Sequence, residues 1–139
     1  MGKVFLGGTC NNSTWRERLI DMLEPAIQYF NPVVEDWTEE CRLNEIKERE
    51  LARTLVYVIT PCMTGVYSIA EVVNDSIKRP EKTILCVLET DVNKDGDIKT
   101  FDDGALRSLH AVKEMVKSDG AKVFNSLEGI AMYLNQLYK

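Results

Sequence analysis

The chain has 139 residues, 45% of them hydrophobic, which is enough to form one compact core, and we interpret residues 1–139 as a single domain. Acidic residues number 22 against 17 Lys and Arg, and no basic block occurs, so the charge argues against a nucleic-acid-binding surface. No apolar stretch approaches the ~20 residues that cross a membrane, and the first strand-like run begins too early to follow a signal peptide. We therefore expect a soluble cytoplasmic protein that binds neither membranes nor nucleic acid.

The four cysteines are scattered, with no C-x-x-C pair, and the chain has one histidine, His110. This pattern does not provide a zinc site, so reduced thiols are expected, and we predict neither a metal centre nor a cofactor. Cys10 and Cys62 follow predicted strands, but neither has a histidine in its turn that could act as the base for a cysteine nucleophile.

Short apolar runs alternate with amphipathic segments along the chain. The run LVYVI at residues 55–59 lacks polar alternation, as expected of a parallel strand covered on both faces. Further strands are expected at residues 3–6, 32–34, 82–88 and 121–124. Helices are expected around residues 15–23, at residues 41–53, after a Ser68 cap through Ile77, at residues 105–117, and from Ser126 to residue 137.

Five strands alternating with five helices predict an α/β fold, a doubly wound parallel sheet of the flavodoxin or Rossmann-like type. We expect the strand order 2-1-3-4-5, with the topological switch point between the first and third strands. Ligands of such sheets bind outside the carboxyl ends of the strands at this point. The turn at residues 7–12 should therefore lie beside residues 60–68 across one crevice.

The turn Gly7-Gly8-Thr9 would let a ligand approach the backbone closely, with helix amides and Arg16 nearby for an anion. It matches neither the G-x-G-x-x-G fingerprint nor a Walker loop. The alternative interpretation is a tight strand-to-helix turn without a ligand.

Glu71 can be interpreted in two ways. On a helical wheel it lies opposite Ile69, Val72, Val73 and Ile77, which predicts a solvated side chain, and Asp75 on the same side is also expected to face solvent. Its place near the start of a helix at the carboxyl edge of the sheet instead predicts a side chain in the crevice or at a subunit contact. The helix N-terminus would then favour the ionised carboxylate.

Residues 91–102, from Asp91 to Asp102, resemble an EF-hand loop at positions 1, 3, 5 and 6, but an Asp stands where the bidentate Glu belongs. The segment follows a buried strand rather than a helix, and no second hand is present to pair with it. We interpret it as a polar surface loop and predict that it does not bind calcium with physiological strength.

The segments KVFLGGT, TWRERLI, PVVEDW, VYVITP and GVYSIAEVV, in this order, resemble the nucleoside 2-deoxyribosyltransferase-like family. The resemblance implies that Glu71 attacks the anomeric carbon of a nucleoside or nucleotide and forms a covalent glycosyl-enzyme, which a second base or water resolves with retention. It also implies a homo-oligomer whose sites are completed by neighbouring subunits. The candidate substrate-binding residues are Gly7, Gly8, Thr9, Asp36, Trp37, Thr60, Gly65 and Ser68.

The chain departs from the transferases at one position. They carry an acidic residue six positions before the nucleophile, which helps to protonate the departing base, and here that position is Gly65. Asp36 or a residue of a neighbouring subunit could take this role. The alternative function is a non-catalytic nucleotide-binding or regulatory module on the same fold.

Overall fold

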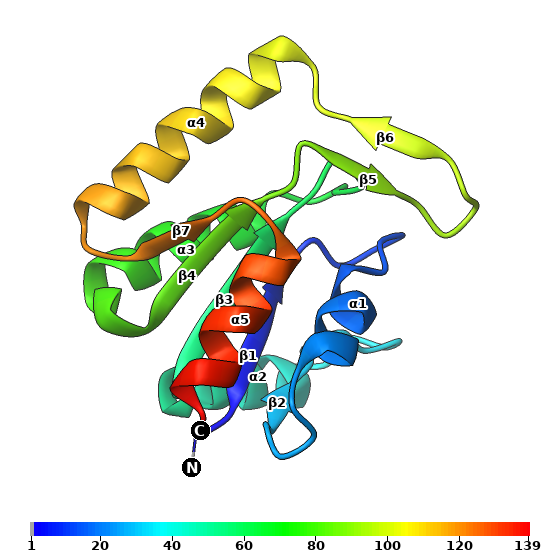
Figure 1. The fold of residues 1–139 in the computed structure, drawn as a ribbon. Helices are drawn as coiled ribbons and strands as arrows, with labels where there is room; N and C mark the ends of the chain where they lie inside the picture. The colour runs from blue at the N-terminus through cyan, green and yellow to red at the C-terminus, as the bar shows by residue number, and fades with distance from the viewer. Residues whose placement is uncertain (1) are drawn as a thin grey trace.

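A computed structural model describes residues 2–139, which form a five-stranded parallel sheet between two layers of helices (Figure 1). The strand order is β2-β1-β3-β4-β7, so the predicted order and the switch point between the first and third strands of the sheet are confirmed. The strands of this sheet are β1 (Val4–Gly8), β2 (Tyr29–Phe30), β3 (Thr54–Ile59), β4 (Thr83–Val87) and β7 (Lys122–Phe124). The other elements are α1 (Trp15–Met22), α2 (Glu39–Leu51), α3 (Tyr67–Lys78), η1 (Pro80–Lys82), β5 (Thr90–Val92), β6 (Ile98–Thr100), α4 (Asp103–Ser118) and α5 (Leu127–Leu137).

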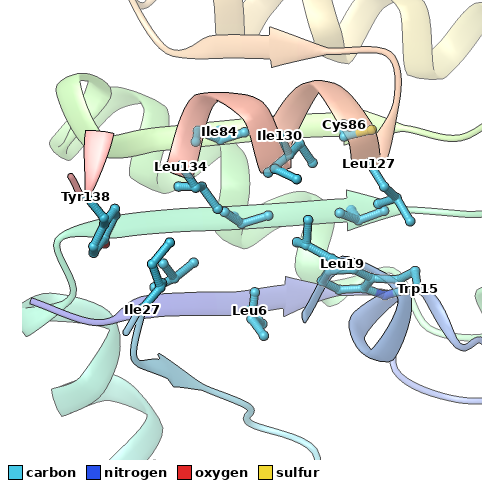
Figure 2. Close-up of a cluster of buried hydrophobic side chains, with 14 residues drawn as sticks. Leu6, Trp15, Leu19, Ile27, Ile84, Cys86, Leu127, Ile130, Leu134 and Tyr138 are labelled. Carbon is cyan, nitrogen blue, oxygen red and sulfur yellow. The ribbon is translucent and has the colours of Figure 1, made fainter. Parts of the chain in front are cut away.

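Alternate residues of the buried strands point to opposite faces of the sheet and build two separate cores. Helices α1 and α5 cover one face, where Trp15 and Leu19 of α1 and Ile130 of α5 pack over Leu6 and Ile84 (Figure 2). Helices α3 and α4 cover the other face. On that side the core is formed by Phe5, Leu55, Tyr57, Ile59, Val72, Leu85, Val87, Leu109 and Val116.

The end of β1 is closely packed against β3. A Cβ atom on Gly7 would lie 2.6 Å from the ring of Tyr57, and one on Gly8 would lie 2.2 Å from the carbonyl oxygen of Val58. Gly8 also has φ of +109°, a conformation that L-residues with side chains rarely adopt. Both glycines are therefore required by the pairing of the two central strands, whether or not a ligand binds.

The second strand and the loop after β4 differ from their predictions. The second strand is Tyr29–Phe30, which pairs with Val4 and Phe5, and not residues 32–34. Pro32 has no amide to donate, and the Val33 amide instead donates to Asn31 Oδ1 at 3.0 Å, which ends the strand. The loop after β4 contains the β5–β6 hairpin, because Asn93 Oδ1 accepts the amides of Asp95 and Asp97 and closes its turn.

Helix α3 also differs from its prediction. It begins at Tyr67, so Ser68 lies in its first turn and is not its cap. Its buried residues are Val72, Asp75 and Ser76, whereas Ile77 is 66% exposed. The buried face of α3 is therefore rotated from the apolar face that the helical wheel indicates. This rotation turns the side of Glu71 and Asp75 toward α2.

The predicted helix start at Ser126 is confirmed. Its Oγ accepts the amide of Gly129 at 3.1 Å and caps α5, while Gly120 follows α4 with φ of +103°. Within residues 2–139, no helix combines the length and apolar character needed to cross a membrane. That residues 91–102 do not bind calcium with physiological strength stays a prediction, which calorimetry would test.

We expect Gly8→Ala to destabilise the protein by about 3 kcal/mol or more, because its Cβ would collide with backbone and its φ would be strained. Gly65→Ala is the matched control, since no atom lies within 4 Å of the added Cβ. This control should change the free energy of unfolding by less than about 1 kcal/mol. Urea unfolding measures both values, and equal midpoints for the two variants would contradict the steric argument.

Candidate functional site

A pocket of about 330 Å³ lies at the carboxyl ends of β1 and β3, where the predicted switch point is. Its walls come from the loop after β1, the loop after β3, the first turns of α3, the segment after β2, and α2. The lining residues include Gly7, Gly8, Thr9, Cys10, Asn11, Arg16, Trp37, Glu45, Gly65, Tyr67, Ser68 and Glu71. A neighbouring cavity of about 250 Å³ shares Trp37, Glu45, Tyr67 and Glu71 and extends the crevice along α2.

Seven of the nine candidate residues line this pocket: Gly7, Gly8, Thr9, Trp37, Gly65, Ser68 and Glu71. Asp36 and Thr60 do not. Asp36 is exposed beside the pocket wall. Thr60 is fully buried behind the pocket, and its amide donates to Thr9 Oγ1 at 2.9 Å, so it reaches the pocket only through Thr9.

The side chain of Glu71 is 11% exposed and faces α2, so the expectation of a solvated glutamate is wrong. Burial, reinforced by the negative charge of Glu45, raises the pKa of Glu71 to about 7. Glu45 lines the same pocket and the same neighbouring cavity as Glu71. The expectation that the helix N-terminus keeps Glu71 ionised is therefore not met, because Glu71 lies in the second turn of α3, where the helix dipole is weak.

Arg49 supplies the positive charge next to Glu71. Its Nη1 lies 3.6 Å from Glu71 Oε2, and this cation lowers the pKa of the carboxyl, against the larger effect of burial. The rest of the guanidinium is committed to Asp75, with Nε 2.9 Å from Oδ2 and Nη2 3.1 Å from Oδ1. This bidentate geometry fixes the position of Arg49.

Asp75 is fully buried, so the expectation that it faces solvent is wrong. Besides Arg49, it accepts a hydrogen bond from the Tyr57 hydroxyl and pairs with Arg79. Donors from α2, from β3 and from the residue that follows α3 therefore stabilise its charge. Through Arg49, this buried carboxylate connects the centre of the sheet to the environment of Glu71.

Arg16 lies under the loop after β1. It donates from Nε to the Leu6 carbonyl at 3.0 Å and from Nη1 to the Thr9 carbonyl at 2.6 Å, while the indole of Trp15 donates to the same Thr9 oxygen at 2.7 Å. The cation is thus used to hold the loop backbone, rather than standing free for an anionic ligand.

Sequence reasoning did not single out Glu45, Arg49 or Tyr57, and it placed Asp75 in solvent. Glu45 and Arg49 are four residues apart on one face of α2, a spacing that places their charges together. However, the many charged residues of this helix predict that all of its faces are exposed to solvent. Only the packing of α2 against α3 distinguishes these two side chains from the other charges of the helix.

The family model described as nucleoside 2-deoxyribosyltransferase like matches residues 2–90, which is most of the chain and contains every residue that lines the pocket. The chain belongs to this family. Membership indicates a role related to glycosyl transfer and the binding of a nucleoside. No curated protein and no solved structure matches the chain significantly.

The raised pKa of Glu71 makes stability depend on pH. Because the folded protein holds this proton up to about pH 7, whereas the ordinary glutamate value is 4.5, the wild type should lose stability as pH rises through this window. Glu71→Gln does not titrate, so relative to wild type it should gain up to about 3 kcal/mol between pH 4.5 and pH 8.

Urea unfolding at several pH values measures this difference. Glu50→Gln, at an exposed position of α2, is the control and should follow the wild type. A stability difference between Glu71→Gln and wild type that does not change with pH would contradict the shifted pKa.

Proposed function

We propose that the protein transfers or hydrolyses the N-glycosidic bond of a nucleoside or nucleotide through a covalent glycosyl-enzyme on Glu71. The observation that carries this proposal is the pair of carboxyl groups of Glu71 and Glu45 in one pocket at the switch point of the sheet. Glycosyl transfer with retention uses two such groups, one as nucleophile and one as acid and base. Family membership supports the same chemistry.

In the first step, a Glu71 oxygen attacks C1′ of the sugar while the bond between C1′ and the base nitrogen breaks. We assign Glu45 as the acid that gives a proton to the departing base. In the second step, Glu45 takes a proton from water or from an incoming base, which attacks C1′ and releases Glu71. Each cycle returns both carboxyl groups to their starting protonation.

The two carboxyls suit these roles because each acts on the other. Burial raises the pKa of both groups, and the negative charge of Glu45 raises the pKa of Glu71 further. A proton on one group therefore favours ionisation of the other. A bound base that accepts a hydrogen bond from Glu45 would hold the proton there and leave Glu71 ionised beside Arg49.

Glu45 would take the place of the acid that is missing at Gly65, where the space around the glycine is open. The same glycine favours the alternative, a module that binds a nucleotide without reacting with it. The rings of Trp37 and Tyr67, which line the pocket with exposed fractions of 56% and 74%, could stack on a base in either case.

Glu71→Gln should lower kcat by about 10³-fold or more while nucleoside binding is retained, because an amide is a poor nucleophile. Glu45→Gln should lower kcat by roughly 10²- to 10⁴-fold, with the smallest loss for substrates whose base leaves easily. For the wild type, kcat/KM should rise with pH up to about 7, as Glu71 loses its proton.

Chromatography of products from a panel of nucleosides, deoxynucleosides and their 5′-phosphates, with and without added free base, measures these rates. Formate or azide should partly restore turnover by Glu71→Ala. A protein that binds members of the panel but cleaves none would favour the binding module. Full activity of Glu71→Gln would exclude this residue as the nucleophile.

We further propose that the protein forms a homo-oligomer through α3. A stripe of apolar side chains, including Val66, Ile69, Ala70, Val73 and Ile77, runs along its outer side next to the pocket, and among the described residues nothing covers it. Val66 and Ile77 are 69% and 66% exposed. A second subunit on this stripe would lie close to Tyr67 at the pocket mouth.

Sedimentation velocity at micromolar concentration should show an oligomer for the wild type and a monomer for Ile77→Asp. Met132→Asp, on the outer side of α5, is the control because Met132 is also well exposed, at 75%, and it should leave the assembly unchanged. A strictly monomeric wild type would count against a shared interface.

A further inference from the structure

The β5–β6 hairpin follows the segment that matches the family, and one buried carboxylate attaches it to the pocket loop. The side chain of Asp91 is fully buried although it lies in a short hairpin strand. Its Oδ2 accepts from Ser13 Oγ at 2.6 Å, and its Oδ1 accepts from Arg18 Nη2 at 2.6 Å and from the Val92 amide at 2.9 Å. Asp91 thus joins the hairpin to the loop before α1 and to α1 itself.

Further bonds connect the same two segments. Ser13 and Asn93 form an antiparallel bridge, and the Lys94 amide donates to Asn12 Oδ1 at 3.2 Å. The Ser13 hydroxyl, which donates to Asp91, accepts the Trp15 amide at 3.3 Å. The start of α1 is therefore held by a side chain whose orientation Asp91 sets.

The other wall of the crevice is connected to the same loop. Thr60 follows β3, and its amide donates to Thr9 Oγ1 at 2.9 Å, while Thr9 lines the pocket. The loop is therefore held at Thr9 by the segment after β3 and at Ser13 by Asp91.

The loop at residues 9–14 depends on such outside contacts, because it has no regular secondary structure of its own. Asn12 has φ of +60°, which is uncommon for a residue with a side chain. The backbone bonds of Thr9 hold the first residue of the loop, whereas Asn12 and Ser13 bond to the hairpin. Cys10 and Asn11, between these anchors, line the pocket.

We propose that Asp91 is a positioning residue of the pocket: through Ser13 it holds the loop at residues 9–14 to the β5–β6 hairpin and so fixes the wall formed by Thr9, Cys10 and Asn11. This inference rests on the proposed function for its effect on a nucleoside, but the attachment of the loop is independent of any reaction. The hairpin is in this sense part of the binding site although it does not line it.

Hydrogen exchange measured by NMR tests the attachment without a ligand. In Asp91→Asn, the amides of Trp15 and Lys94 should exchange about tenfold faster or more, while those of Val56 and Leu85 in the central sheet keep their wild-type rates. Arg18→Met, at a half-exposed position, should show the same pattern more weakly and covers the case in which Asp91→Asn does not fold. Asp97→Ala is the control, because this exposed aspartate of the same hairpin bonds only through its backbone.

Kinetics test the consequence for binding. With the nucleoside that the wild type cleaves fastest, Asp91→Asn should raise KM about tenfold and change kcat by less than about threefold, and Asp97→Ala should change neither. The proposal would be overturned if the loop amides of Asp91→Asn exchange at the wild-type rate, or if the amides of the loop and of the central sheet are accelerated equally. It would also be overturned if the loop amides exchange faster while KM is unchanged. If the wild type cleaves no nucleoside, the proposed function fails, and the exchange pattern alone then decides whether Asp91 holds the loop.

Discussion

The bidentate ion pair between Arg49 and Asp75 joins α2 to α3, and the environment of Glu71 depends on it. Removing one partner of a buried pair leaves the other charge without compensation, which typically costs 3–5 kcal/mol. Here the Tyr57 hydroxyl and Arg79 also bond to Asp75 and stabilise its charge. Burial raises the pKa of Glu45 and Glu71, and the cation of Arg49, fixed in this way, opposes the change at both carboxyl groups.

The fold was predictable from the sequence because its signal is local. The run at residues 55–59 is apolar without alternation, and the structure places it as the central strand β3. Ser126 and Gly120 mark helix ends through their own hydrogen bond and dihedral angle. The wrong strand at residues 32–34 shows the limit of this reasoning: two valines favoured a strand, but the preceding proline and asparagine directed the backbone elsewhere.

The site was predictable only in part, because its chemistry depends on distant pairs. The turn after β1 and the start of α3 were correctly placed on one crevice, since strand order alone brings them together. The helical wheel misjudged Glu71 and Asp75 because it treats a charged residue as solvated, whereas Arg49 on another helix compensates both charges. Glu45 could not be assigned for the same reason, and Asp91 was interpreted as part of a polar surface loop, whereas it is buried with Ser13 and Arg18 as partners.

Helix α2 contributes Glu45 to the pocket and Arg49 to the neighbouring cavity, but it has no fully buried residue of its own. Its attachment relies on polar contacts: the Arg49 pair, the Thr38 cap, and the link between Lys3 and Glu48 at 3.2 Å. Of these contacts, only the partly exposed pair of Lys3 and Glu48 is readily screened as ionic strength rises, whereas the buried pair of Arg49 and Asp75 is screened much less. Because α2 has few apolar contacts, we expect this wall of the crevice to open locally at a lower free energy than the sheet behind it, so a ligand can find the crevice open while the sheet stays intact.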